Sequence, residues 1–149
     1  MYKLNRVVPF RVYKERTGDL TAINSQYKMQ AWGRDIEELK KNCVKAICKH
    51  AQKQFKSGKF FLASVPENPQ EEEEIICITL DLDKSLKIQI RNILLELGIS
   101  QIELCKKLNM HPSLLSKFLS FKKSTHLSTL EYIAKVLKLE LEISIRRGA

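Results

Sequence analysis

Residues 100–118 read SQIELCKKLNMHPSLLSKF, and the local signals in this stretch predict two short helices joined by a tight turn. Ser100 and Glu103 have the spacing of a capping box, which fixes the start of the first helix. Asn109 stands where that helix must end in a left-handed residue, a conformation that asparagine tolerates better than most residues. Pro112 suits the first position of the next helix, because an amide hydrogen would have no partner there.

Two helices with this short connection are the pattern of a helix-turn-helix, whose second helix enters the major groove of DNA. The apolar positions that can face one core are Leu104, Leu108, Leu114, Leu115 and Phe118. Cys105 fits the small position where the helices cross. The polar positions left outside are the predicted DNA contacts: Gln101 and His111 at helix ends near the backbone, and Ser113, Ser116 and Lys117 near base edges. Core helices of an unrelated domain could show the same caps, so the flanking segments must decide.

Helical spacing continues on both sides of the pair. Upstream, apolar residues recur from Leu86 to Leu97 and stop at Gly98, a natural helix end. Downstream, Ser128 and Glu131 predict a second capping box. Four short helices with the tight turn between the second and third resemble the phage-repressor type of helix-turn-helix domain, which implies DNA binding.

The loop between the third and fourth helices, residues 121–126, is a candidate clamp on the DNA backbone. Lys122, Lys123 and Ser124 are its predicted contacts, because ammonium groups, hydroxyls and free amides suit phosphate oxygens without reading sequence.

Composition limits the remaining possibilities. The 149 residues leave room for one ordinary domain or two small ones, and 44% hydrophobic content supports a packed core. No apolar run approaches the roughly 20 residues of a membrane span, so we expect a soluble cytoplasmic protein with no membrane partner. The four cysteines lack C-x-x-C spacing and the three histidines lack neighbouring ligands. We therefore expect reduced, buried thiols, no metal site and no cofactor.

The net charge of +9 is unevenly distributed. Residues 1–64 hold 14 basic and 5 acidic residues, residues 65–74 hold five acids and no base, and residues 75–149 hold 12 basic and 7 acidic residues. An excess of positive charge favours association with nucleic acid, although a solvated basic surface is also common in proteins that bind none. The acidic segment 66–74 contains two prolines and predicts a linker between a domain at 1–65 and a domain at 75–149.

Alternating apolar residues predict two strands, at 75–82 and 139–146, that bracket the four helices. A two-stranded ribbon is marginal alone, and its edges favour pairing with a second copy of the chain. These strands are therefore the candidate interface of a homodimer or higher oligomer that binds two DNA half-sites.

The first domain combines a small sheet with one helix. Strands are predicted at 7–14, 20–24, 28–32 and 60–65, and a helix begins at Asp35, whose carboxylate can form a capping box with Glu38. Apolar residues line one stripe of this helix, whereas lysines occupy the rest of its surface. A solvated face explains these lysines more simply than nucleic-acid contact, although both explanations remain open. The fold class is therefore α+β.

Residues 30–42 read QAWGRDIEELKKN, and this glycine, helix cap, paired glutamate and asparagine resemble the HicB antitoxin family. The order of parts along nearly the whole chain is also similar. The resemblance implies a partial RNase H-like domain, followed by a helix-turn-helix domain. It also implies two partners, a HicA-like ribonuclease toxin that is neutralised and the operator DNA of the operon that encodes both proteins.

Two further classes of function deserve comparison with an antitoxin. An RNase H-like enzyme needs several carboxylates converging on metal ions, and the first strand offers none, so we expect no catalytic site. A stand-alone repressor, whose first domain binds a ligand or another protein, is not separated from an antitoxin by sequence.

Overall fold

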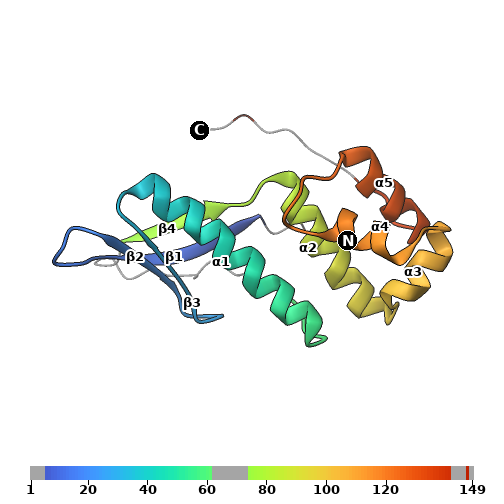
Figure 1. Cartoon of the computed structure of the whole chain (residues 1–149), viewed down its shortest axis with the longest axis horizontal. Helices are drawn as coiled ribbons and strands as arrows, with labels where there is room; N and C mark the ends of the chain where they lie inside the picture. Colours follow the sequence, from blue (N-terminus) through green and yellow to red (C-terminus); the bar gives the residue numbers. More distant parts are fainter. Residues whose placement is uncertain (1–5, 62–73, 142–146, 148–149) are drawn as a thin grey trace.

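The computed structural model of the chain describes residues 6–61, 74–141 and Arg147. The elements along the chain are β1 (Val7–Lys14), β2 (Leu20–Asn24), β3 (Met29–Gly33), α1 (Ile36–Lys56), β4 (Ile75–Thr79), α2 (Leu82–Leu97), α3 (Gln101–Leu108), α4 (Pro112–Leu119) and α5 (Leu127–Val136). The strands and α1 form one unit, and α2 to α5 form a second, helical unit (Figure 1). The α+β class predicted from the sequence is confirmed.

The four strands form one antiparallel sheet in the order β3-β2-β1-β4. Alternate side chains of these strands face α1, as the two-residue period of a strand requires. The core between sheet and helix includes Val8, Phe10, Ala22, Ile78, Leu39, Cys43, Ile47 and Ala51. Four consecutive helical turns supply the last four of these residues, so the apolar stripe predicted for this helix is its sheet-facing side. Burial raises the pKa of the Cys43 thiol to about 11.

The strand expected at 75–82 is shorter than predicted and has a different partner. β4 ends at Thr79 and pairs with β1, with Val8 opposite Ile78, so it completes the N-terminal sheet instead of flanking the helices. β4 follows the segment 66–74 that was predicted as a linker, yet it belongs to the same sheet as β1. The amide of Val12 also donates to the Glu74 carbonyl. The chain passes to the helical unit at Asp81, whose carboxylate caps α2.

Three other predicted segments fall wholly or partly outside the described residues. The fourth strand predicted at 60–65 is described only at Phe60 and Phe61, which are not in a strand. Of the linker at 66–74, only Glu74 is described. In the segment 139–146, residues 139–141 are described and are not in a strand, so the strand predicted there was wrong for that part; residues 142–146 lie outside the described residues.

The start of α1 follows the predicted cap with one difference. The amide of Glu38 donates to the Asp35 carboxylate at 2.8 Å, as expected for an N-cap. The Glu38 carboxylate accepts from the amide of Arg34, one residue before the cap, and also pairs with the Arg34 guanidinium. The first turn of α1 is thus fixed to the end of β3 by local contacts.

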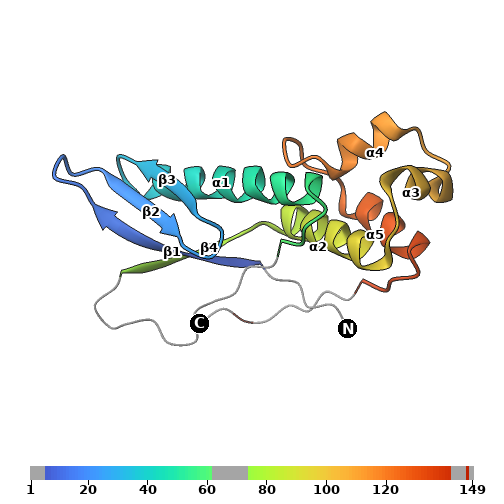
Figure 2. The same ribbon diagram turned by 90° about the horizontal axis from the view of Figure 1, so that it is seen from below.

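Contacts between α1 and α2 join the two units (Figure 2). The backbone of Phe61, just after α1, forms two hydrogen bonds with the buried amide side chain of Asn92 in α2. The Arg91 guanidinium lies 5.6 Å from the ring centroid of Phe55 in α1 and 5.6 Å from that of Phe121, in the loop after α4. Aromatic faces attract a guanidinium, so Arg91 ties α1 to that loop.

Within the described residues, no helix is long and apolar enough to cross a membrane.

Candidate nucleic-acid interface

The turn between α3 and α4 has the geometry that the sequence predicts. Ser100 and Glu103 form both bonds of the capping box at the start of α3. Asn109 ends α3 in the left-handed conformation, with φ 50° and ψ 48°. Pro112 occupies the first position of α4. These local signals hold α3 and α4 at a fixed angle over one core, which contains Leu104, Leu108, Leu115 and Leu119.

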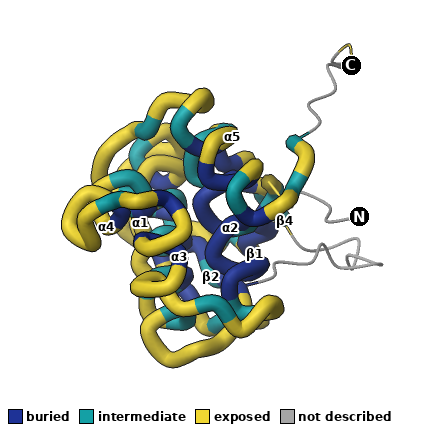
Figure 3. The backbone as a smooth tube through the Cα atoms, turned by 90° about the vertical axis from the view of Figure 1, so that its right-hand side faces the viewer, coloured by how far each residue is buried: buried dark blue, intermediate teal, exposed yellow. Residues whose placement is uncertain are grey.

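All eight residues predicted to contact DNA are exposed. They are Gln101 at the first position of α3, His111 before α4, Ser113, Ser116 and Lys117 on α4, and Lys122, Lys123 and Ser124 in the loop after it. Figure 3 shows α4 at the surface of the helical unit, whereas α2 is buried in its middle. The structure therefore leaves these side chains accessible to a nucleic acid from the α4 side.

His111 has a structural role in addition to its exposure. Its Nδ1 accepts from the amide of Ser113 at 3.2 Å and lies 2.7 Å from the Ser113 hydroxyl. The imidazole thus acts as the N-cap of α4, and it also fixes the position of the Ser113 side chain. Among the described contacts, the hydroxyl of Ser116, the other serine of α4, has no hydrogen bond.

Two buried cations of α2, Lys87 and Arg91, hold the end of α4 and the loop after it. The Lys87 ammonium donates to the carbonyls of Ser120 and Lys123 at 2.8 and 2.7 Å and to the Asp83 carboxylate at 3.0 Å. The Arg91 guanidinium donates to the carbonyl of Leu119 at 3.0 Å. These bonds satisfy carbonyls at and beyond the end of α4, and they leave Lys122, Lys123 and Ser124 exposed.

A third anchor closes the loop near its far end. The Thr125 amide donates to Asp83 at 2.9 Å, and the Thr125 hydroxyl donates to the carbonyl of Phe118 at 2.8 Å. Asp83 therefore accepts from both Lys87 and Thr125, which orders the segment that presents Lys122 and Lys123. Prior ordering of such a loop lowers the entropic cost of binding a phosphate backbone.

The sequence misassigned one residue of this surface. The apolar pattern predicts Leu114 in the core, but this residue is 40% exposed. Leu115 and Leu119, one turn apart, already face the core, and Leu114 lies about 100° around α4 from Leu115. An apolar side chain beside Ser113 and Lys117 suits the methyl group of thymine. The four-residue spacing of Leu115 and Leu119 is the sequence signal that places Leu114 outside the core.

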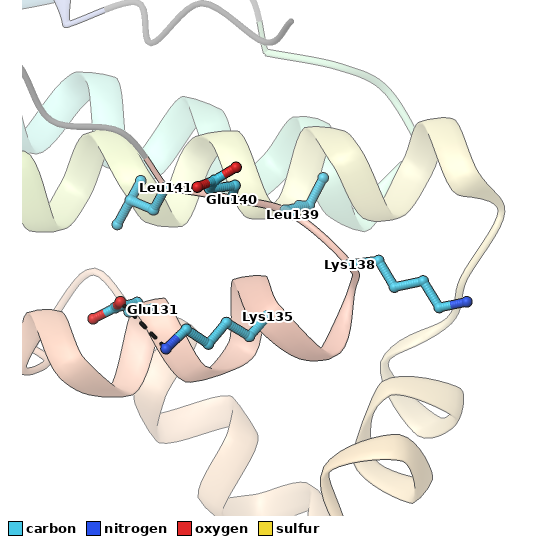
Figure 4. Close-up of a pocket in the computed structure, with 6 residues that line it drawn as sticks. All are labelled: Glu131, Lys135, Lys138, Leu139, Glu140 and Leu141. Carbon is cyan, nitrogen blue, oxygen red and sulfur yellow. Dashed lines mark ion pairs between the residues drawn. The ribbon is translucent and has the colours of Figure 1, made fainter.

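The start of α5 also differs from the prediction. The helix begins at Leu127 after His126, with no side-chain capping bond, so the capping box expected from Ser128 and Glu131 was wrong. The carboxylate of Glu131 instead pairs with the Lys135 ammonium at 3.5 Å. Both residues line a shallow hollow of about 380 Å³ between α5 and the segment after it (Figure 4). No residue of α3 or α4 lines this hollow, so it is not part of the exposed surface described above.

The described residues contain four free cysteines, of which Cys43 and Cys105 are buried, Cys48 is half-buried and Cys77 is exposed. The expectation of buried thiols is thus wrong for Cys77. Within the described part of the chain, no group of three histidine, cysteine, aspartate or glutamate side chains lies close enough to hold a metal ion.

Comparison with known families agrees with this geometry. Residues 90–143 match a family model, HTH_3, described as helix-turn-helix. No curated protein matches the chain. The matched range starts within α2, includes α3, α4 and α5, and contains all eight predicted contacts. Residues 90–143 therefore form a phage-repressor-like helix-turn-helix domain, the DNA-binding part of a transcriptional regulator.

Proposed function

We propose that the chain is a transcriptional repressor that reads its operator with α4. The observation that carries this proposal is the outward position of Ser113 and Lys117 on α4, whose start is capped by His111 and whose end and following loop are held by Lys87 and Arg91 of α2. Lys117 reads base edges, Ser113 and Ser116 lie beside it, and Gln101 and His111 contact the backbone at the helix ends. Lys122, Lys123 and Ser124 hold the adjacent phosphates.

Replacing Lys117 by alanine tests base reading. We expect discrimination between operator and random-sequence DNA to fall by about 1–3 kcal/mol, because a donor to a guanine edge is lost. The operator is first selected from random duplexes with the full-length chain, and both affinities are then measured by titration. An equal loss on operator and random DNA would make Lys117 a phosphate contact.

The paired variant Lys122→Ala and Lys123→Ala provides the contrast. These lysines contact phosphates, so we expect weaker binding to operator and random DNA alike, and a salt dependence shallower by about 0.9 in log–log slope for each lost contact. Titrations across a series of salt concentrations measure this slope. If it equals that of the unaltered chain, the loop does not contact DNA.

We also propose that the repressor binds as a homodimer or higher oligomer through its C-terminal segment. Leu139 and Leu141 pack against the helical core, so a test must retain them. Deleting residues 142–149 is expected to give monomers by light scattering and to abolish tight operator binding, because two half-site contacts become one. A truncated chain that remains oligomeric would place the interface elsewhere.

A second proposal is that the repressor is also an antitoxin, whose N-terminal unit binds a HicA-like ribonuclease. Trp32 and Tyr13 favour it: each is 48% exposed, and they lie in one cross-strand row with Thr21, on the sheet face opposite α1. Exposed aromatic rings are common anchors in protein interfaces. The lysines of α1 are on the other side of the unit, so they do not repel a basic toxin from this sheet face.

Coexpression tests the antitoxin proposal. The full-length chain is needed, because a chain cut at residue 66 lacks β4. With the product of a neighbouring short gene, the unaltered chain should copurify and restore growth, whereas Trp32→Ser with Tyr13→Ser should do neither and still bind operator. If the unaltered chain fails both tests but represses its operator, it is a stand-alone repressor with another partner for its first unit.

A further inference from the structure

One face of α1 is strongly basic. Between Leu39 and Phe61 the sequence contains seven lysines and no acidic residue. The lysines of the helix itself are all exposed: Lys40, Lys41, Lys45, Lys49, Lys53 and Lys56. Within the described residues, none of them has an ion-pair partner. Among the described residues this cluster of positive charge is uncompensated, and such a surface attracts a polyanion.

The basic face points directly away from the sheet. At 100° per residue, Lys45, Lys49 and Lys56 fall within about 40° of one another around the helix. They lie on the side opposite the buried residues Leu39, Cys43, Ile47 and Ala51. We call Lys45, Lys49 and Lys56 the lysine row. From the first to the last, the row extends along the helix for about 17 Å, the length of about five base pairs of a DNA strand.

The lysine row lies on the same side of the molecule as α4. Figures 2 and 3 both show α1 and α4 on the side away from β1 and β4. The Arg91 guanidinium, which contacts the rings of both Phe55 and Phe121, holds the last turn of α1 against the loop that carries Lys122 and Lys123. The end of the lysine row at Lys56 therefore lies toward the loop that we propose to bind phosphates.

We propose that the lysine row binds the phosphate backbone of DNA that flanks the operator. This inference rests on the proposed function of α4, and it extends that interface by a contact that reads no sequence. Charge complementarity and the position of the row toward the loop at Lys122 and Lys123 select duplex DNA as the occupant. The N-terminal unit then increases affinity when the duplex extends far enough beyond the operator to reach the lysine row, whereas α4 determines which site is bound.

The test compares two duplexes, one ending at the edges of the selected operator and one extended by twelve random base pairs on each side. The variant is the triple Lys45→Gln, Lys49→Gln and Lys56→Gln, which removes charge and keeps good helix formers. The matched control places arginine at the same three positions, because arginine keeps the charge and also binds phosphate. Affinities of full-length proteins are measured across a range of salt concentrations.

The unaltered chain and the arginine control should bind the long duplex more tightly than the short one, with a log–log salt slope steeper by about 0.9 for each lysine engaged. The glutamine triple should lose this difference, and all three proteins should bind the short duplex equally. If the glutamine triple keeps the full advantage of the long duplex, or weakens both duplexes equally, the inference is wrong and the row is a solvated face. If the unaltered chain selects no operator at all, the proposed function itself fails.

Discussion

Replacing Lys87 by methionine is expected to lower the free energy of unfolding by about 3 kcal/mol, because removing one partner of a buried ion pair leaves its other partner uncompensated. The Lys87 side chain is 0% exposed and serves Asp83, Ser120 and Lys123 at once. Methionine fills a similar volume but leaves two carbonyls and a carboxylate without this donor. Asp83 remains 18% exposed and keeps the Thr125 amide, so the loss stays at the lower end of the range for buried pairs.

Urea unfolding measures this loss, and Lys84→Met on the same helix is the matched control. Lys84 also pairs with an aspartate, Asp81, but both side chains reach solvent, so its replacement should cost less than about 1 kcal/mol. The Lys87 variant should also bind operator more weakly under conditions where it remains folded, because the loop at Lys122 and Lys123 loses its anchor. Equal unfolding midpoints for the two variants would contradict the buried network.

The sequence identified the helix ends correctly where the signal is local. Asp35, Ser100, Gly98 and Asn109 act through hydrogen bonds or backbone angles of neighbouring residues, so their roles follow from spacing alone. The capping box at Ser100 formed because Ser100 has the extended backbone of an N-cap, just before α3. The box predicted at Ser128 did not form because Ser128 lies inside the first turn of α5.

The contacts between distant segments were not predictable from one sequence. A lysine in a helix is normally exposed, and nothing near Lys87 in the chain indicates that two carbonyls more than 30 residues away would surround it. The same holds for Asn92 with Phe61. The alternation of residues 75–79 correctly predicted a strand but contained no information about its partner, β1.

The exposure of the candidate DNA contacts was predicted more completely than the fold. Their exposure follows from the helical period once the core positions of α3 and α4 are known, and this period is readable in the sequence. Leu114 is the exception, since hydrophobicity alone placed it inside. The loop lysines were predicted from composition, but the buried cations that fix their backbone were not.

Gly33→Ala is expected to lower the free energy of unfolding by about 3 kcal/mol or more, because the added carbon meets backbone atoms that cannot move independently. A Cβ at this position would lie 2.4 Å from the amide nitrogen of Leu39, 2.7 Å from its Cα and 3.0 Å from the Asp35 carbonyl oxygen. Relief requires that the first turn of α1 move away from β3. That movement pulls fully buried Leu39 out of the core and disturbs the Asp35 cap.

Gly18→Ala is the control for Gly33→Ala. At Gly18 the substitution places alanine at a positive φ, but the added Cβ meets no other atom. Gly18 has φ 91° and open space around a Cβ, so the cost there should be only about 1–2 kcal/mol. The fluorescence of Trp32, the single tryptophan of the chain, follows urea unfolding of the N-terminal unit directly beside the altered residue. The Gly33 variant should unfold at the lower urea concentration. If the Gly18 variant unfolded at the lower urea concentration instead, Gly33 would have room for a Cβ beside the backbone of Leu39.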